Sequence, residues 1–230
     1  MIATPPVEPV AAPWRRRPLD DVLADARATF DIPRGRPTIL AVDGRQGSGK
    51  TTIANQLAAL VPGTVIVHSD DVAWWEAFFD WAHLMANGIL EPLQHGVDVD
   101  YRPHAWEARD REGSIMVPAK APLVVIEGVG VSRRSLVPMF DGAFWVQSDH
   151  SEARRRGLER DGGSQADIDF WDEWVHEEEL FLADDRPWER ALAILCGTPH
   201  LADVDFDPTT EVLIGRAPPA LTTERVGPGP

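Results

Sequence analysis

Eight consecutive residues, from Gly44 to Thr51, have the types and spacing that bind a phosphate chain. The segment reads Gly-Arg-Gln-Gly-Ser-Gly-Lys-Thr and fits the Walker A pattern G-x-x-x-x-G-K-[ST]. Its glycines let the backbone wrap closely around phosphates with N–H groups turned inward, Lys50 reaches the β- and γ-phosphates, and the Thr51 hydroxyl can ligate Mg²⁺. The candidate phosphate-binding residues are Gly44, Gln46, Gly47, Ser48, Gly49, Lys50, Thr51 and Thr52. The motif predicts a site for a nucleoside triphosphate.

The lysine content bears on which nucleotide this loop would bind. Lys50 and Lys120 are the only lysines among 22 Lys and Arg residues. GTPases read guanine with an N-K-x-D element, whereas Lys120 lies in the sequence Ala-Lys-Ala-Pro. A switch GTPase is therefore disfavoured, and ATP is the expected nucleotide.

Candidate strands alternate with helical segments between residues 38 and 196, which is typical of βαβ units. Five short runs rich in apolar residues are expected to be strands: 38–42, 64–68, 123–126, 143–146 and 191–196. Helices are expected over about 19–26 and 50–60. The pattern predicts an α/β chain with a P-loop NTPase-type three-layer fold, in which a five-stranded, mostly parallel sheet has helices on both faces. Ligands bind at the carboxyl ends of the strands in such sheets.

The composition fits a globular chain and excludes several kinds of binding. Of 230 residues, 43% are hydrophobic and 26% charged, and the net charge is −15. So acidic a chain is a poor candidate for sequence-independent binding of nucleic acid, and no apolar run is long enough to predict a membrane span. The single cysteine, Cys196, cannot form an internal disulfide, so a cytoplasmic protein is expected.

Proline-rich segments flank the expected domain. Residues 1–17 are predicted to be a flexible leader, and residues 208–230 a loosely ordered tail. Residues 18–207 are then a single domain, and the sequence leaves open whether it forms a homo-oligomer.

Two further segments follow the Walker A motif: His-Ser-Asp-Asp at 68–71 and Val-Val-Ile-Glu-Gly at 124–128. From about residue 38 to 198, the sequence resembles the uridine kinase and phosphoribulokinase group of P-loop kinases, most of all an uncharacterised uridine-kinase-like branch. The resemblance implies ATP- and Mg²⁺-dependent transfer of a γ-phosphate to a hydroxyl group, and a helical lid at about 151–165.

The acidic pair at the end of the second candidate strand is the expected place of the general base. In the resembled kinases an acid here faces the substrate hydroxyl, and a carboxylate just beyond a strand can accept the proton of that hydroxyl. We predict that Asp70 is the base, with Asp71 as the alternate base or its supporting partner. The competing interpretation is that the pair caps a helix beginning near Trp74.

Glu127 and the lid arginines complete the implied catalytic set. The 124–128 segment resembles a Walker B strand with Glu in place of Asp, so Glu127 is expected to hold Mg²⁺ with Thr51, directly or through water. Arg156 and Arg160 share a helix face and are expected to close over the transferring phosphoryl group. The alternatives are a carboxylate that merely terminates a strand and a solvated basic face.

Aromatic residues gather in the segments that build the acceptor pocket of the resembled kinases. Trp74 is a candidate for stacking on a flat ring, although core packing is the commoner role of aromatic side chains. Tyr101, Arg102 and His104 are weaker substrate candidates, because Asp-Tyr-Arg-Pro-His at 100–104 loosely resembles the base-contacting stretch of uridine kinases. Arg133 is a candidate for holding a phosphate on the acceptor, or else a solvent-facing residue.

These residues together predict an ATP- and Mg²⁺-dependent kinase of a small molecule, with a nucleoside as the expected acceptor. Two alternatives remain. One is a kinase of another small acceptor, such as a secondary metabolite, sugar, short acid or nucleotide. The other is a non-catalytic ATP-binding module.

Overall fold

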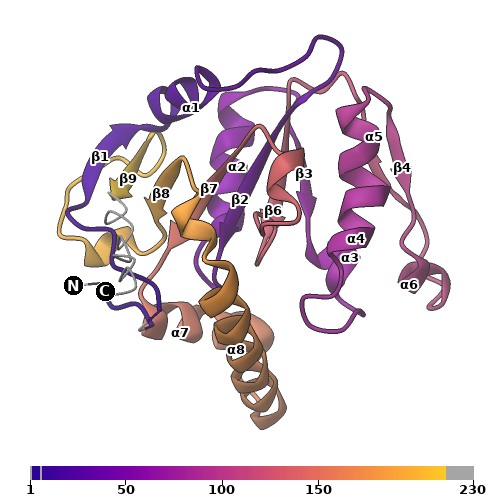
Figure 1. Cartoon of the computed structure of the whole chain (residues 1–230). Helices are drawn as coiled ribbons and strands as arrows, with labels where there is room; N and C mark the ends of the chain where they lie inside the picture. The colour runs from indigo at the N-terminus through magenta and orange to yellow at the C-terminus, as the bar shows by residue number, and fades with distance from the viewer. Residues whose placement is uncertain (1, 6, 216–230) are drawn as a thin grey trace, which may run out of the picture.

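A seven-stranded β-sheet forms the middle layer of the protein in a computed structural model, which describes residues 2–5 and 7–215 (Figure 1). Across the sheet the strands are β1 (Arg15–Pro18), β9 (Glu211–Gly215), β8 (Ala193–Cys196), β7 (Gly142–Gln147), β2 (Thr38–Gly44), β6 (Leu123–Gly128) and β3 (Val65–His68). The five from β8 to β3 are parallel, whereas β9 is antiparallel to both neighbours. The α/β prediction is confirmed, and the strand count is corrected from five to seven.

The central strands β2 and β6 are buried along their whole length. Ile39 and Ala41 of β2 face one hydrophobic cluster, and Leu40 and Val42 face another. Successive side chains of a strand point to opposite faces of its sheet. A continuous apolar run therefore needs cover on both sides, which explains the three layers.

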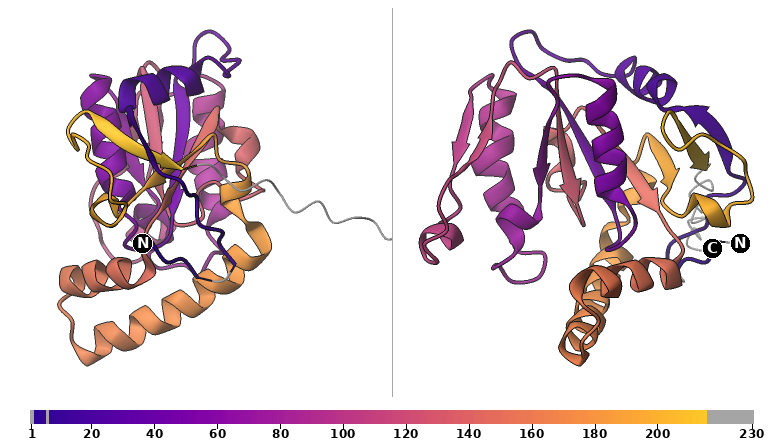
Figure 2. Two further views of the ribbon diagram at one scale, coloured as in Figure 1. Left: turned by 90° about the vertical axis from the view of Figure 1, so that its left-hand side faces the viewer. Right: turned by 180° about the vertical axis from the view of Figure 1, so that it is seen from behind.

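Helices supply this cover on the two faces of the sheet (Figure 2). Helices α1 (Leu19–Arg27) and α2 (Lys50–Leu60) pack on the Leu40 face. Helix α4 (Ala82–Met85), the π-helical Ala86–Leu90 and α5 (Glu91–Gln94) pack on the other face. The shorter elements are α3 (Asp70–Ala73), α6 (His104–Glu107), the antiparallel pair β4 (Val99–Tyr101) and β5 (Ile115–Val117), and 3₁₀ turns at Val137–Met139, Pro187–Glu189 and Pro199–Leu201. None of the helices in the described residues is long and apolar enough to cross a bilayer.

Helices α7 (His150–Asp161) and α8 (Gln165–Asp185) form a hairpin that projects beyond one end of the sheet (Figures 1 and 2). The Asp149 side chain caps α7, and Ser164 forms a capping box with Asp167 at the start of α8. These caps fix where each helix begins. The hairpin contains the segment that the sequence predicts to be a lid.

The described parts of both chain ends belong to the fold, although the sequence analysis expected a flexible leader and a loosely ordered tail. Strands β1 and β9 pair with each other at the edge of the sheet. Glu8 is only 3% exposed. Trp145 Nε1 and Gln147 Nε2 donate hydrogen bonds to its carboxylate. These contacts hold the described residue Glu8 of the leader against the sheet. Residues 216–230 of the predicted tail lie outside the described residues.

Candidate active site

The predicted phosphate-binding loop connects β2 to α2 at the carboxyl end of the central strand. At Gly44 (φ 157°), a Cβ atom would lie 2.5 Å from the carbonyl oxygen of Val146. At Gly47 (φ 72°), a Cβ atom would lie 2.3 Å from the carbonyl oxygen of Ala153. Gly49 (φ 98°) precedes α2, whose N-terminus no side chain caps. The first N–H groups of α2 can therefore bind phosphate.

Lys50 and Thr51 begin α2 and lie beside Glu127. The Lys50 side chain is buried, and its Nζ donates a hydrogen bond to the carbonyl oxygen of Arg45 at 2.8 Å. Thr51 Oγ1 donates to Glu127 Oε1 at 3.0 Å. Mg²⁺ is usually held by one or two such oxygen groups together with substrate phosphates and water. The pair fits Mg²⁺, and the described residues contain no cluster of three or more His, Cys, Asp or Glu that suggests a different metal site.

His68 belongs to the site, although the sequence analysis gave it no role. Strands β3 and β6 pair His68 with Glu127 in register, and His68 Nδ1 lies 2.6 Å from Glu127 Oε1. This hydrogen bond raises the pKa of His68. Burial acts to raise the pKa of Glu127, but the bond from His68 and the charge of Lys50 outweigh burial and lower that pKa. Glu127 is thus held as an oriented carboxylate. The sequence alone does not show this contact, because it depends on the pairing of β3 with β6.

Asp43 is a second residue that the sequence analysis missed. Its fully buried carboxylate accepts hydrogen bonds from the N–H groups of Gly44, Gly130 and Ser132 and from the Ser132 hydroxyl, all at 2.7 to 2.8 Å. Burial raises the pKa of Asp43, and these hydrogen bonds oppose the rise. Asp43 therefore ties the start of the phosphate loop to the segment after β6.

Two cavities meet at the phosphate loop. The larger, about 450 Å³, lies beside α2, α7 and the ends of β8 and β9. The smaller, about 260 Å³, lies between the loop, the residues after α3, and α8. Gly47, Lys50, Thr51 and Arg160 line both cavities. A phosphoryl donor in one cavity and an acceptor in the other would therefore meet at these four residues.

The eight candidate phosphate-binding residues divide between these spaces. Gly47, Gly49, Lys50, Thr51 and Thr52 line the larger cavity, and Gln46 lines the smaller one. Gly44 and Ser48 are buried and line neither. The loop thus presents its second half to the larger cavity.

The structure places the adjacent carboxylates of Asp70 and Asp71 in different surroundings. Asp70 lines the smaller cavity, where Lys50 and Arg160 act on it electrostatically. Its surroundings in the cleft raise the pKa of Asp70 by desolvation, and those two positive charges oppose the rise. Asp71 instead forms an ion pair with Arg111, with 2.8 Å between Asp71 Oδ1 and Arg111 Nη2, and does not line the cavity. Of the two carboxylates, only that of Asp70 therefore lines the smaller cavity.

The lid arginines also divide in position. Arg156 lines the larger cavity and donates to the carbonyl oxygen of Gly197 at 2.8 Å. Arg160 lines both cavities and is held by an ion pair with Asp161 at 2.7 Å. The structure thus brings both predicted arginines to the loop, and Arg160 to the junction.

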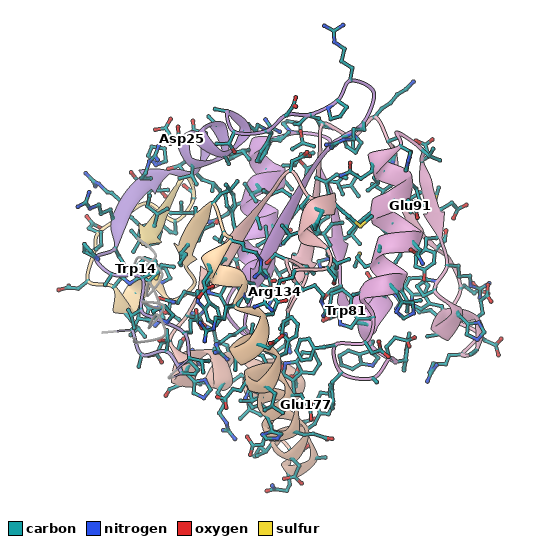
Figure 3. The ribbon with its side chains drawn as sticks, in the orientation of Figure 1. Trp14, Asp25, Trp81, Glu91, Arg134 and Glu177 are labelled. Carbon is teal, nitrogen blue, oxygen red and sulfur yellow. The ribbon has the colours of Figure 1, made fainter. Side chains whose placement is uncertain are left out.

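Aromatic side chains from two distant segments form a wall of the smaller cavity. Its aromatic lining residues are Trp74, Phe78, Phe79, Trp81, Phe170 and Trp174. The rings of Phe78 and Trp174 meet edge to face with centroids 5.4 Å apart. Phe79 stacks on Phe181 of α8 at 4.3 Å. Figure 3 shows the labelled Trp81 in the region where the chain before α4 approaches α8. These contacts join the loop after α3 to the lid hairpin.

Tyr101, Arg102 and His104 lie away from the smaller cavity. The Tyr101 ring packs closely against Gly88. Arg102 is exposed and donates to the carbonyl oxygen of Arg111, and the exposed His104 lies near Glu107 on its own helix. The structure therefore does not join these residues to the predicted acceptor site.

Arg133 is neither solvent-facing nor in the cavity lining. Its side chain is buried, with Nε donating to the carbonyl oxygen of Gly130 and Nη1 to that of Phe79. Its guanidinium carbon lies 4.4 Å from the centroid of Trp81 and 4.9 Å from that of Phe181. Arg133 therefore supports the aromatic wall from behind. Of the weaker substrate candidates Asp71, Trp74, Tyr101, Arg102, His104 and Arg133, Trp74 alone lines the smaller cavity.

A buried ionic cluster connects the phosphate loop to the leader and to α8. Arg45 Nε lies 2.7 Å from Glu8 Oε2, and Arg45 Nη1 lies 3.2 Å from Glu178 Oε2. Glu178 Oε1 also accepts a hydrogen bond from the Gln46 N–H at 2.7 Å. Because Glu178 is on α8, the helix that contributes Phe170 and Trp174 to the aromatic wall is fastened to the loop at this point.

We expect Glu178→Ala to lower the free energy of unfolding by about 3–5 kcal/mol, because it leaves the buried Arg45 with one anionic partner fewer. Urea denaturation measures the loss. The control is Glu173→Ala on the same helix. Because the side chain of Glu173 is exposed, we expect this variant to change the free energy of unfolding by less than about 0.5 kcal/mol. Equal stability of Glu178→Ala and the wild type would show that the cluster contributes nothing.

The fold has known relatives among solved structures, whereas no protein-family model and no curated protein matches the sequence. A possible uridine kinase from Bacillus stearothermophilus is 18% identical, with a TM-score of 0.50 over 76% of this chain and 97% of that chain. A "putative fructose transport system kinase" from Silicibacter sp. TM1040 is 20% identical, with a TM-score of 0.50 over 75% of this chain and 93% of that chain. The chain therefore has the fold that these two structures share.

Proposed function

We propose that the protein is an ATP- and Mg²⁺-dependent kinase that transfers the γ-phosphoryl group to a hydroxyl of a small molecule. One observation carries this proposal: two cavities share Lys50, Thr51 and Arg160, and Asp70 lines only the smaller one. The larger cavity suits ATP and the smaller one the acceptor.

The proposed residues act on one balanced step. The acceptor oxygen forms a bond to the γ-phosphorus, the bond between that phosphorus and the β–γ bridging oxygen breaks, and ADP leaves. Asp70 accepts the hydroxyl proton. Lys50, Arg160 and the loop amides stabilise the charge that spreads over the phosphoryl oxygens.

Thr51 and Glu127 are the residues that would hold Mg²⁺, and His68 orients the Glu127 carboxylate. When bound, Mg²⁺ neutralises charge on the β- and γ-phosphates. Arg156, held by Gly197, adds a positive charge on the nucleotide side. Lys50, Arg156 and Arg160 thus concentrate positive charge at the site in a chain whose net charge is −15.

The acceptor occupies an aromatic cavity in this proposal, so its body is a flat or apolar ring. A nucleoside, which the sequence resemblance implies, meets this requirement through its base. Other ring-bearing alcohols meet it equally. Sugars and short acids meet it less well, because they present little apolar surface to the wall.

The proposal is tested by acceptor-dependent release of ADP from Mg·ATP. Nucleosides, nucleotides, sugars and aromatic alcohols are screened with the wild type and with Lys50→Ala. We expect one class to give ADP and phosphorylated acceptor in equal amounts with the wild type alone. ATP binding without ADP release for any acceptor would favour the non-catalytic module.

A pH dependence follows from the role of Asp70. Because the base must be ionised and its pKa is raised, kcat/KM is expected to fall as the pH drops through a value above the ordinary 3.8 of Asp. The rate therefore rises with pH along the acidic limb. The residual activity of Asp70→Asn should lack this limb, with unfolding measured at each pH as the control. The same limb in the variant would assign it to another group.

A further inference from the structure

The positive charges of the smaller cavity lie at one end of it. Lys50 and Arg160 are the cationic side chains in its lining, and both also line the larger cavity. Arg133, the remaining candidate for holding a phosphate, lies behind the aromatic wall and outside the cavity lining, where its Nε and Nη1 donate to carbonyl oxygens. A phosphate on the acceptor would need a cation of its own at the aromatic end. The described lining offers none, which favours an acceptor without a phosphate at that end.

The lining of the smaller cavity also includes a carboxylate residue, Glu76, which lies between Trp74 and Phe78 in the sequence. No described residue forms an ion pair or a side-chain hydrogen bond with it, unlike Asp71 with Arg111. An ionised carboxylate only accepts hydrogen bonds. The half-buried Glu76 carboxylate can therefore accept hydrogen bonds from a ligand in the cavity.

The rings around Glu76 favour a positively charged donor. Arg133 lies over Phe79, Trp81 and Phe181, so those rings already have a cation beside them. In the described structure no cation lies over the four other aromatic lining residues, Trp74, Phe78, Phe170 and Trp174. Aromatic faces attract cations, most strongly where water is excluded. A cavity lined by both a carboxylate and such faces is a combination that binds an ammonium group.

We infer that the smaller cavity binds an unphosphorylated amino alcohol with an aromatic or apolar ring. Its ammonium group lies between Glu76 and the aromatic faces, and its hydroxyl lies toward Asp70. The inference rests on the proposed function for the statement that this ligand is the phosphoryl acceptor. Its affinity for the cavity does not depend on that function.

Calorimetric titration without ATP tests the inference with four probes. They are 2-amino-1-phenylethanol, its neutral analogue 1-phenylethane-1,2-diol, uridine, and uridine 5′-monophosphate. We expect the amine to bind about tenfold more tightly than the diol, from an ion pair and cation–π contacts at a cavity site. Equal or tighter binding of the diol or of uridine would overturn the choice of an amine. Tighter binding of the monophosphate than of uridine would overturn the exclusion of phosphate.

A matched pair of variants assigns the preference to Glu76. Glu76→Gln keeps the shape of the side chain and is expected to remove the tenfold preference while binding the diol and Mg·ATP as the wild type does. Glu91→Gln makes the same change at an exposed glutamate on α5, far from the cavity (Figure 3). It should keep the preference. A preference that survives in Glu76→Gln would overturn the assignment.

Addition of Mg·ATP distinguishes the inference about amine binding from the proposed kinase function. If the amine binds through Glu76 but is never phosphorylated, the binding inference holds and the proposed kinase function fails. If another class of acceptor is phosphorylated and the amine does not bind, the kinase function holds and the inference fails.

Discussion

Lys50→Ala is expected to lower kcat by about 10²–10³-fold, or about 2.7–4 kcal/mol of transition-state stabilisation, the usual effect of removing one preorganised donor. Lys50 lines both cavities at their junction, and its Nζ is already turned toward the phosphate loop by the hydrogen bond to Arg45. No neighbouring lysine can take its place. Steady-state kinetics with the acceptor found in the screen measure the effect.

The second lysine of the chain is the matched control. Lys120 is exposed and lines neither cavity, so Lys120→Ala should keep the kcat of the wild type. Undiminished turnover of Lys50→Ala would contradict the role of the loop. Equal losses in both variants would point to a general effect of removing lysine.

Asp70→Asn is expected to lower kcat by about 10²–10⁴-fold, the range for loss of a general base. Asparagine has nearly the same shape as aspartate, so the cavity and the affinity for Mg·ATP should persist. The loss should therefore appear in kcat and not in nucleotide binding, which calorimetry measures separately.

Asp71→Asn provides the comparison, because Asp71 is the adjacent residue and makes its ion pair with Arg111 outside the cavity. It should keep kcat within a few-fold of the wild type. A larger loss for Asp71→Asn than for Asp70→Asn would reverse the assignment that the geometry supports.

The parallel core of the fold could be predicted because its strands are continuous apolar runs, a pattern that buried parallel strands require. The edge strands β1 and β9 could not be predicted from the sequence. Strand β1 contains Arg15, Arg16 and Arg17 and ends in Pro18, a composition that indicates a loop unless its partner is known. Its partner β9 begins almost 200 residues later, so the pairing is a tertiary event without a local signal.

The site was predictable where the motif is local and unpredictable where the contacts are distant. The Walker A spacing, the acidic pair that follows β3 and Glu127 near the end of β6 are visible in the sequence. The contacts of Glu178 with Arg45 join segments 133 residues apart. The sequence analysis considered Arg133 a phosphate-binding or solvent-facing residue. A sequence does not show that three aromatic rings and two carbonyl oxygens surround the guanidinium of Arg133.

A crystal structure with Mg²⁺ and a non-hydrolysable ATP analogue tests most directly whether the loop is the place from which a phosphoryl group is passed on. We expect the triphosphate on the amides of Gly47 to Thr51, Mg²⁺ beside Thr51 and Glu127, and the γ-phosphate directed toward Asp70. A nucleotide bound elsewhere, or one whose γ-phosphate points away from the aromatic cavity, would contradict the proposed kinase.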